Sequence, residues 1–245
     1  MVEFQRKDFY SYEDFLEIMR LLRAPGGCPW DREQTHSSIR RNFLEETYEV
    51  LDAIDHDDAS GMCEELGDVL MQVAFHAQIE AERGRFTMAN VVDGVARKLV
   101  YRHPHVFGDV QADTSQQVLA NRDVLKRREK GQRSTADAVE AVPHTLPALW
   151  RAEKIQSKTA KAGFDWTSSL QALDKLEEEV RELRAALEAG QAADAPHGIR
   201  EELGDTLFMA AKIAQMSGVD PEDALHRACD KFDRRFRAVE EAADK

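Results

Sequence analysis

Residues 44–54 read Leu-Glu-Glu-Thr-Tyr-Glu-Val-Leu-Asp-Ala-Ile, and residues 65–68 read Glu-Leu-Gly-Asp. In the first stretch Glu46 and Glu49 stand three residues apart among apolar positions, and the two acids of the second stretch have the same spacing. Residues three apart share one face of an α-helix, so each stretch is predicted to be a helix that carries an acidic pair. A hairpin of the two helices would bring four carboxylates together.

The same pattern returns in the second half of the chain. Glu179 and Glu182 are again three apart, and Glu-Leu-Gly-Asp recurs at residues 202–205. The interval from the second acid to the third is 16 residues in the first copy and 20 in the second. Each copy is followed by a Lys and an Arg four residues apart, namely Lys98 and Arg102, then Lys231 and Arg235. The constant order of these features indicates a duplication.

Hydrophobic periodicity predicts an all-α protein made of tandem duplicated helical domains. Residues 1–107 are expected to form the first domain, residues 108–143 a polar connecting segment, and residues 144–245 the second domain. Helices are expected at residues 9–24, 37–54, 62–83, 87–101, 146–162, 170–188, 200–216 and 221–243, and the charged stretch 116–130 is compatible with another. Loops are expected at residues 28–31 and 163–166, and a turn around Pro104.

Composition limits the classes of function. The 245 residues are 42% hydrophobic and 32% charged, a balance typical of a folded, helix-rich protein. No run approaches the roughly 18 apolar residues of a membrane-spanning helix, and the charged N-terminus lacks the features of a secretion signal. Three scattered cysteines, Cys28, Cys63 and Cys229, indicate reduced thiols rather than disulfides. We therefore expect a cytoplasmic protein without a membrane partner.

The net charge is −13, which disfavours direct binding of nucleic acid. A phosphorylated small molecule remains compatible with this charge, provided that a cation lies between its phosphates and the acidic residues.

Four converging carboxylates repel one another and suit a hard divalent cation. Mg²⁺ takes a few carboxylate oxygens and keeps positions for water and for substrate phosphates. The predicted ligands are Glu46, Glu49, Glu65 and Asp68 in the first copy and Glu179, Glu182, Glu202 and Asp205 in the second. A solvated acidic face is the alternative for any single pair. Gly67 and Gly204, each costing about 1 kcal/mol relative to Ala inside a helix, favour close helix packing beside the acids.

Further motifs lie around the acids in a fixed order. They are Cys-Pro-Trp-Asp at 28–31, Arg-His-Pro-His-Val-Phe at 102–107, Gly-Phe-Asp-Trp at 163–166 and Lys-Phe-Asp-Arg-Arg-Phe at 231–236. Together with the acidic segments they resemble the MazG family of nucleoside triphosphate pyrophosphohydrolases. The resemblance implies an all-α fold of the NTP pyrophosphatase type, assembled as a homodimer whose protomers complete the helical bundle around each site. It also implies Mg²⁺-dependent hydrolysis of a nucleoside triphosphate to the monophosphate and pyrophosphate.

Carried onto this chain, the resemblance makes the second acid quartet the magnesium ligands. It places phosphates against Lys231 and Arg235, and it sets Lys175, Glu178 and Glu201 beside the nucleotide. The implied substrate-binding set is Lys175, Glu178, Glu201, Asp205, Lys231, Arg234 and Arg235, with Lys98 and Arg102 as first-copy counterparts of Lys231 and Arg235. The basic pair can alternatively be an ordinary solvated face. Glu178 is the candidate general base, so the catalytic set is Glu178, Glu179, Glu182, Glu202 and Asp205.

The two copies are not equivalent in their cations. Asn42 stands where the second copy has Lys175, and Tyr101 stands where it has Arg234. Arg40 and Arg41 are alternative cations in the first copy, whose complete acid quartet is compatible with hydrolysis, binding or regulation. We expect the second copy to be the main catalytic site. The aromatic residues Phe164 and Trp166 either stack on a base or pack at a helix start, and packing is the favoured interpretation.

Two other functional classes stay open from the sequence. One is a helical module that binds Mg-nucleotide without turnover. The other is a structural helical dimer whose acidic faces are merely solvated. If the enzyme interpretation holds, control or cleaning of the nucleotide pool is the expected role.

Overall fold

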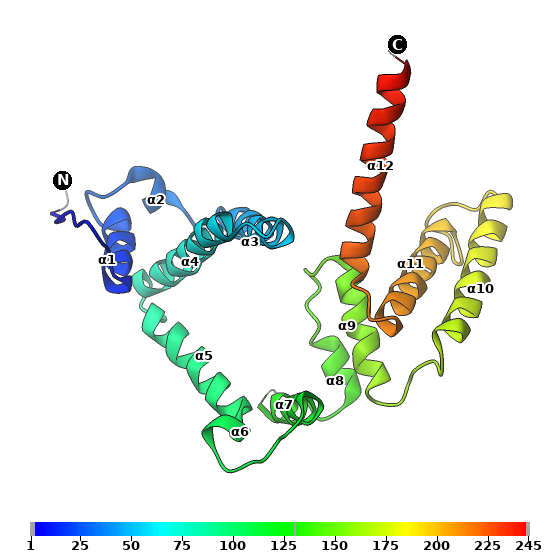
Figure 1. The fold of residues 1–245 in the computed structure, drawn as a ribbon, viewed down its shortest axis with the longest axis horizontal. Coiled ribbons are helices and arrows are strands. Elements are labelled where there is room, and N and C mark those ends of the chain that lie inside the picture. Colours follow the sequence, from blue (N-terminus) through cyan, green and yellow to red (C-terminus); the bar gives the residue numbers. More distant parts are fainter. Residues whose placement is uncertain (1–2, 130, 244–245) are drawn as a thin grey trace. The chain divides into compact units, whose positions relative to one another are not determined.

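The computed structural model describes residues 3–129 and 131–243, and every regular element in this part of the chain is a helix (Figure 1). Contacts divide the chain between Arg122 and Asp123, inside the expected connecting segment, into two compact units. Each unit is described below by itself. None of the described helices is long and apolar enough to cross a lipid bilayer.

The described part of the first unit contains six helices and the first half of a seventh. They are α1 (Tyr12–Arg23), α2 (Pro29–Glu33), α3 (Arg40–Asp55), α4 (Ala59–Glu82), α5 (Met88–Arg102), α6 (Pro104–Phe107) and α7 (Ser115–Glu129), the last of which continues across the division. Helix α1 begins with a capping box between Ser11 and Asp14, and Asp58 caps α4 by accepting from two backbone N–H groups.

Five further helices lie in residues 131–243 of the second unit. They are α8 (Thr135–Glu140), α9 (Ala148–Ala160), α10 (Ser169–Glu188), α11 (Ile199–Met216) and α12 (Pro221–Ala243). The long helices expected from the sequence are confirmed in both units, with ends that agree to within three residues. Residue 130, the last position of the stretch 116–130, lies outside the described residues.

Two expected irregular segments are short helices instead. The predicted loop at residues 28–31 was wrong, because Pro29 begins α2, and the turn expected around Pro104 is α6, which Pro104 begins. Proline has a backbone φ suited to the first turn of a helix and loses no hydrogen bond there.

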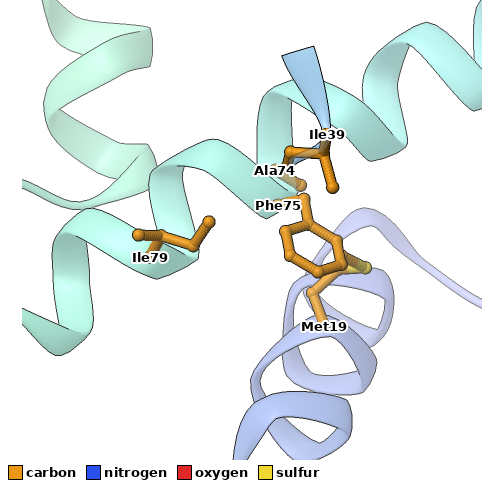
Figure 2. Packing of buried hydrophobic residues seen from close by; sticks show 5 residues of the cluster. All are labelled: Met19, Ile39, Ala74, Phe75 and Ile79. Atoms are coloured by element: carbon orange, nitrogen blue, oxygen red, sulfur yellow. The ribbon is translucent and has the colours of Figure 1, made fainter. Parts of the chain in front are cut away.

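The core of the first unit lies where α1 crosses α4. Met19 of α1 lies against Phe75 of α4, and both belong to a buried cluster with Ile39, Ala74 and Ile79 (Figure 2). Helix α3 pairs with α4 along the acidic segments. The apolar cluster therefore fixes α1 and α4, while the α3–α4 pair carries the carboxylates.

The second unit repeats this plan, with α10 paired to α11 and α9 packed on α11. Its last helix is attached mainly at the first turn, where Trp150 Nε1 of α9 donates to Asp220 Oδ1 at 2.9 Å. The same Asp220 oxygen accepts the backbone N–H groups of Glu222 and Asp223. Beyond this anchor α12 leaves the α9–α11 group as a lone helix, exposed from Ala224 to Ala243 (Figure 1).

Candidate active site

Three carboxylates of the second copy converge between α10 and α11. Ligand-capable oxygens of Glu179, Glu202 and Asp205 all lie within 4.8 Å of one another. Glu179 is 7% exposed and Glu202 5% exposed, whereas Asp205 is open to solvent. Buried carboxylates are rare unless they are paired or coordinate a metal, so this trio has the donor chemistry of a hard cation site.

The pKa values around the trio reflect crowding of negative charge. Partial desolvation by nearby protein atoms, followed by the charges of Glu179 and Glu201, raises the pKa of Asp205. Partial desolvation, followed by the charge of Glu179, also raises the pKa of Glu182. Glu182 is exposed and lies outside the close trio, although it lies near enough to respond to the charges of Glu179 and Glu202. A bound cation would relieve this repulsion.

One lysine already faces the acids. Lys175 Nζ lies 2.9 Å from Glu179 Oε1 and donates to Glu178 Oε1 at 2.7 Å. These contacts raise the pKa of Lys175, so it is protonated at physiological pH. The hydrogen bond from Lys175 lowers the pKa of Glu178, which keeps this carboxylate ionised but makes it a weaker base while Lys175 is bound to it.

Three carboxylates also converge in the first copy, but no lysine occupies the position equivalent to Lys175. Oxygens of Glu46, Glu49 and Glu65 lie within 4.8 Å of one another. Burial, then the charges of Asp68 and Glu49, raises the pKa of Glu46, which places Asp68 close to the trio although outside its tightest group. Burial, then Glu49, likewise raises the pKa of Glu65. Asn42 occupies the position equivalent to Lys175.

The expected phosphate-binding cations lie on other helices. Lys231, Arg234 and Arg235 belong to the exposed part of α12, and they make no hydrogen bond or ion pair within residues 3–129 and 131–243. In the first unit, Lys98 is an exposed residue of α5, and Arg102 ends that helix. Among the described residues, the three α12 cations therefore make no contact with the carboxylates of the second copy.

The packing prediction for Gly67 and Gly204 was wrong within this chain. A Cβ added at either position would meet no atom of the described residues within 4 Å. Glycine is therefore not required there by contacts inside the unit.

Sequence reasoning missed one residue at the start of α11. His197 has a positive φ of 55°, and its backbone N–H donates to Glu201 Oε2 at 2.7 Å. Its Nδ1 lies 3.8 Å from Glu202 Oε1, so His197 lies next to both Glu201 and the acid trio. The His-Gly pair before a helical run was the available signal for this turn.

Comparison with known proteins agrees with the duplicated geometry. The family model described as the MazG nucleotide pyrophosphohydrolase domain matches residues 34–107 and again residues 167–239, more than half of the chain. The chain belongs to the MazG family.

Curated relatives resemble this MazG-family chain over most of its length. It is 46% identical over 226 residues to the nucleoside triphosphate pyrophosphohydrolase of Escherichia coli K12, covering 92% of this chain and 85% of that protein. It is 42% identical to the nucleoside triphosphate pyrophosphohydrolase/pyrophosphatase MazG of Thermotoga maritima, covering 96% and 87% of the two chains. The relative from Mycobacterium tuberculosis, also named nucleoside triphosphate pyrophosphohydrolase, is 43% identical over 62% of this MazG-family chain and 45% of its own length.

Proposed function

We propose that this chain hydrolyses nucleoside triphosphates to nucleoside monophosphates and pyrophosphate, with Mg²⁺ as cofactor and the second copy as the main catalytic site. The observation that carries the proposal is the trio Glu179, Glu202 and Asp205 facing Lys175 in a chain of the MazG family. The first copy has a comparable trio, but Asn42 there offers no charge to a phosphate.

The residues fit Mg²⁺ because every donor in the trio is a carboxylate oxygen and two of the three acids are buried. Glu182 and the trio would hold the cation. The chemistry supplied by the cation, when bound, is neutralisation of phosphate charge and polarisation of the attacking water.

The protein groups then perform positioning and proton transfer. Lys175 offers a fixed positive charge to the phosphates, and Glu178 takes a proton from the attacking water. The water oxygen forms a bond to the α-phosphorus as the bond from that phosphorus to the bridging oxygen breaks, and pyrophosphate leaves. Glu201 is assigned a place beside the nucleotide, since His197 holds it at the start of α11.

Dimerisation is part of the proposal. Helix α12 exposes Leu225, Phe232, Phe236 and Val239, and it also carries Lys231, Arg234 and Arg235. A homodimer that buries this apolar face would bring the basic residues of α12 into a helical bundle. The three cysteines are free thiols, which supports a cytoplasmic setting, and control or cleaning of the nucleotide pool is the role we assign.

Release of pyrophosphate from a panel of ordinary and modified triphosphates, with Mg²⁺ and with a chelator, tests the proposal. We expect monophosphate and pyrophosphate in equal amounts, and no reaction with the chelator. Binding of Mg-nucleotide without any product would indicate a sensing module instead. Thermal stability unaffected by Mg²⁺ plus nucleotide would indicate a purely structural protein.

A further inference from the structure

Two buried positions differ between the copies in a way that the carboxylates do not explain. Phe75 and Lys212 each lie ten residues after the first acid of Glu-Leu-Gly-Asp, and Met19 and Gln156 each lie four residues before the end of their helix. In the first copy Met19 and Phe75 pack together in the core (Figure 2). In the second copy both positions are polar, yet Gln156 is only 4% exposed and Lys212 only 3%.

A cavity of about 400 Å³ adjoins these polar residues, between α9, α11 and the Gly-Phe-Asp-Trp loop. Its walls include Ile155, Phe208 and Met209, and Trp166 is 39% exposed beside them. The volume is within the range of small-molecule sites, which are mostly apolar with a few placed polar groups. In the first copy the position equivalent to Lys212 is occupied by the buried residue Phe75.

The polar groups in the cavity wall are only partly satisfied. Gln156 Nε2 donates to the backbone oxygen of Phe208 at 2.7 Å, but Gln156 Oε1 has no donor among the described residues. Lys212 pairs with Asp165 and donates to Gln215 Oε1 at 2.7 Å. Burying an acceptor without a donor is costly, so a ligand donor is the natural partner of Gln156.

The cavity and the acidic trio lie at successive positions along the same helix, α11. Phe208 and Met209 come three and four residues after Asp205, on the same face of α11. Lys212 lies about 10 Å further along the axis than Asp205, at about 1.5 Å per residue. The cavity therefore lies along the same helix face as the predicted phosphate site.

We propose that this cavity binds the nucleobase of the substrate triphosphate. Trp166 and the apolar wall would pack on the faces of the base, and Gln156 and Lys212 would bond its polar edge. The inference rests on the proposed function and adds to it the part of the site that recognises the base. Under this proposal Trp166 contacts the base, whereas the sequence alone favoured a packing role for it.

The test compares a nucleotide with a ligand that has no base. For wild type, Gln156→Met and Trp166→Leu, the KM for a nucleoside triphosphate and the inhibition constant of inorganic tripolyphosphate are measured in the same assay. Gln156→Met keeps the length of the side chain and removes the amide. Trp166→Leu changes a partly exposed side chain, so it tests the cavity even if Gln156→Met fails to fold. Lys161→Met removes a Lys–Asp pair outside the cavity and is the matched control.

We expect each cavity variant to raise the KM for the nucleotide about tenfold, the effect of losing one well-made contact, with the tripolyphosphate constant unchanged and the control like wild type. Equal rises for both ligands, or no rise in either variant, would overturn the base site while leaving the hydrolase intact. A wild-type protein that releases no pyrophosphate from any triphosphate would instead overturn the proposed function and the inference with it.

Discussion

Lys175 lies 2.9 Å from Glu179, so a cation of the protein already touches the acid trio before any metal binds. The ammonium group therefore has two effects on ligands. It attracts the phosphates of a nucleotide, and it competes with a metal ion for the oxygens of Glu179. The first copy, with Asn42 at this position, has neither effect.

The variant Lys175→Asn places in the second copy the residue that the first copy has at the equivalent position, Asn42. We expect Mg²⁺ alone to bind several-fold more tightly, because the competing charge is gone, while kcat/KM for the nucleotide falls about tenfold or more. Calorimetry with Mg²⁺ and steady-state kinetics measure the two effects. Arg184→Asn, on the same helix and outside the contacts described for the trio, serves as control. Loss of both metal and nucleotide binding would contradict this role of Lys175.

Stabilisation by Mg²⁺ should depend on pH. The pKa values of Asp205 and Glu182 are raised in the folded protein, mainly by partial desolvation and then by neighbouring acids, so these two groups hold protons more tightly in the folded state than in the unfolded state. Their contribution to the free energy of unfolding therefore falls as the pH rises from about 4, the ordinary carboxyl pKa, through the raised values. Mg²⁺ binds the ionised acids, so its stabilising effect should be large at neutral pH and small near pH 4.

Thermal denaturation with and without saturating Mg²⁺ measures this dependence. At about 100 times the dissociation constant the cation should add about 2.7 kcal/mol to the free energy of unfolding at neutral pH. An equal shift at both pH values would contradict binding at these carboxylates.

Asp220→Ala should loosen the attachment of α12. The variant removes the acceptor for Trp150 Nε1 and for two backbone N–H groups at the helix start, and loss of such a cap costs about 1 kcal/mol. Burial acts to raise the pKa of Asp220, but the hydrogen bonds from Trp150 and the backbone prevail and lower it. Its contribution is therefore present above the unfolded-state pKa and is lost as the pH falls through the folded-state value.

Urea unfolding at neutral and acidic pH checks the Asp220 prediction. The difference between wild type and variant should shrink in acid, whereas Asp194→Ala, which removes an exposed pair with Arg200, should show little effect at either pH. A difference that does not depend on pH would contradict the role of the ionised Asp220.

The exposed aromatic pair on α12 should control assembly. The rings of Phe232 and Phe236 lie 6.1 Å apart, and both side chains are exposed on α12. Replacing both by Ser should convert a dimer into a monomer and reduce activity, because large apolar areas drive association and α12 carries the predicted phosphate cations. Light scattering after size exclusion measures the mass. A wild-type monomer with full activity would contradict the dimer.

Much of the fold was predictable because long helices with acidic pairs at a three-residue spacing leave few alternatives. The convergence of Glu179, Glu202 and Asp205 followed from that spacing and from a hairpin of α10 and α11. The short helix α8 was missed, although its capping box between Ser134 and Asp137 is visible in the sequence.

The polar cavity was not predictable from one copy alone. A lysine such as Lys212 inside a helical pattern normally lies on the solvated face, and only tertiary packing shows that it is buried. Comparison of the copies supplies the missing signal, because Phe75 occupies the equivalent position. The packing prediction for the glycines failed for a related reason. The energetic cost of Gly67 in a helix does not identify a neighbouring residue that would require glycine at this position.

The most direct test of the account compares matched carboxylate variants of the two copies by release of pyrophosphate. Glu179→Gln with Asp205→Asn disables the second copy, and Glu46→Gln with Asp68→Asn changes the equivalent acids of the first. We predict that the second-copy variant loses activity by about a hundredfold or more, while the first-copy variant retains most of it. Full activity in the second-copy variant would contradict the central claim.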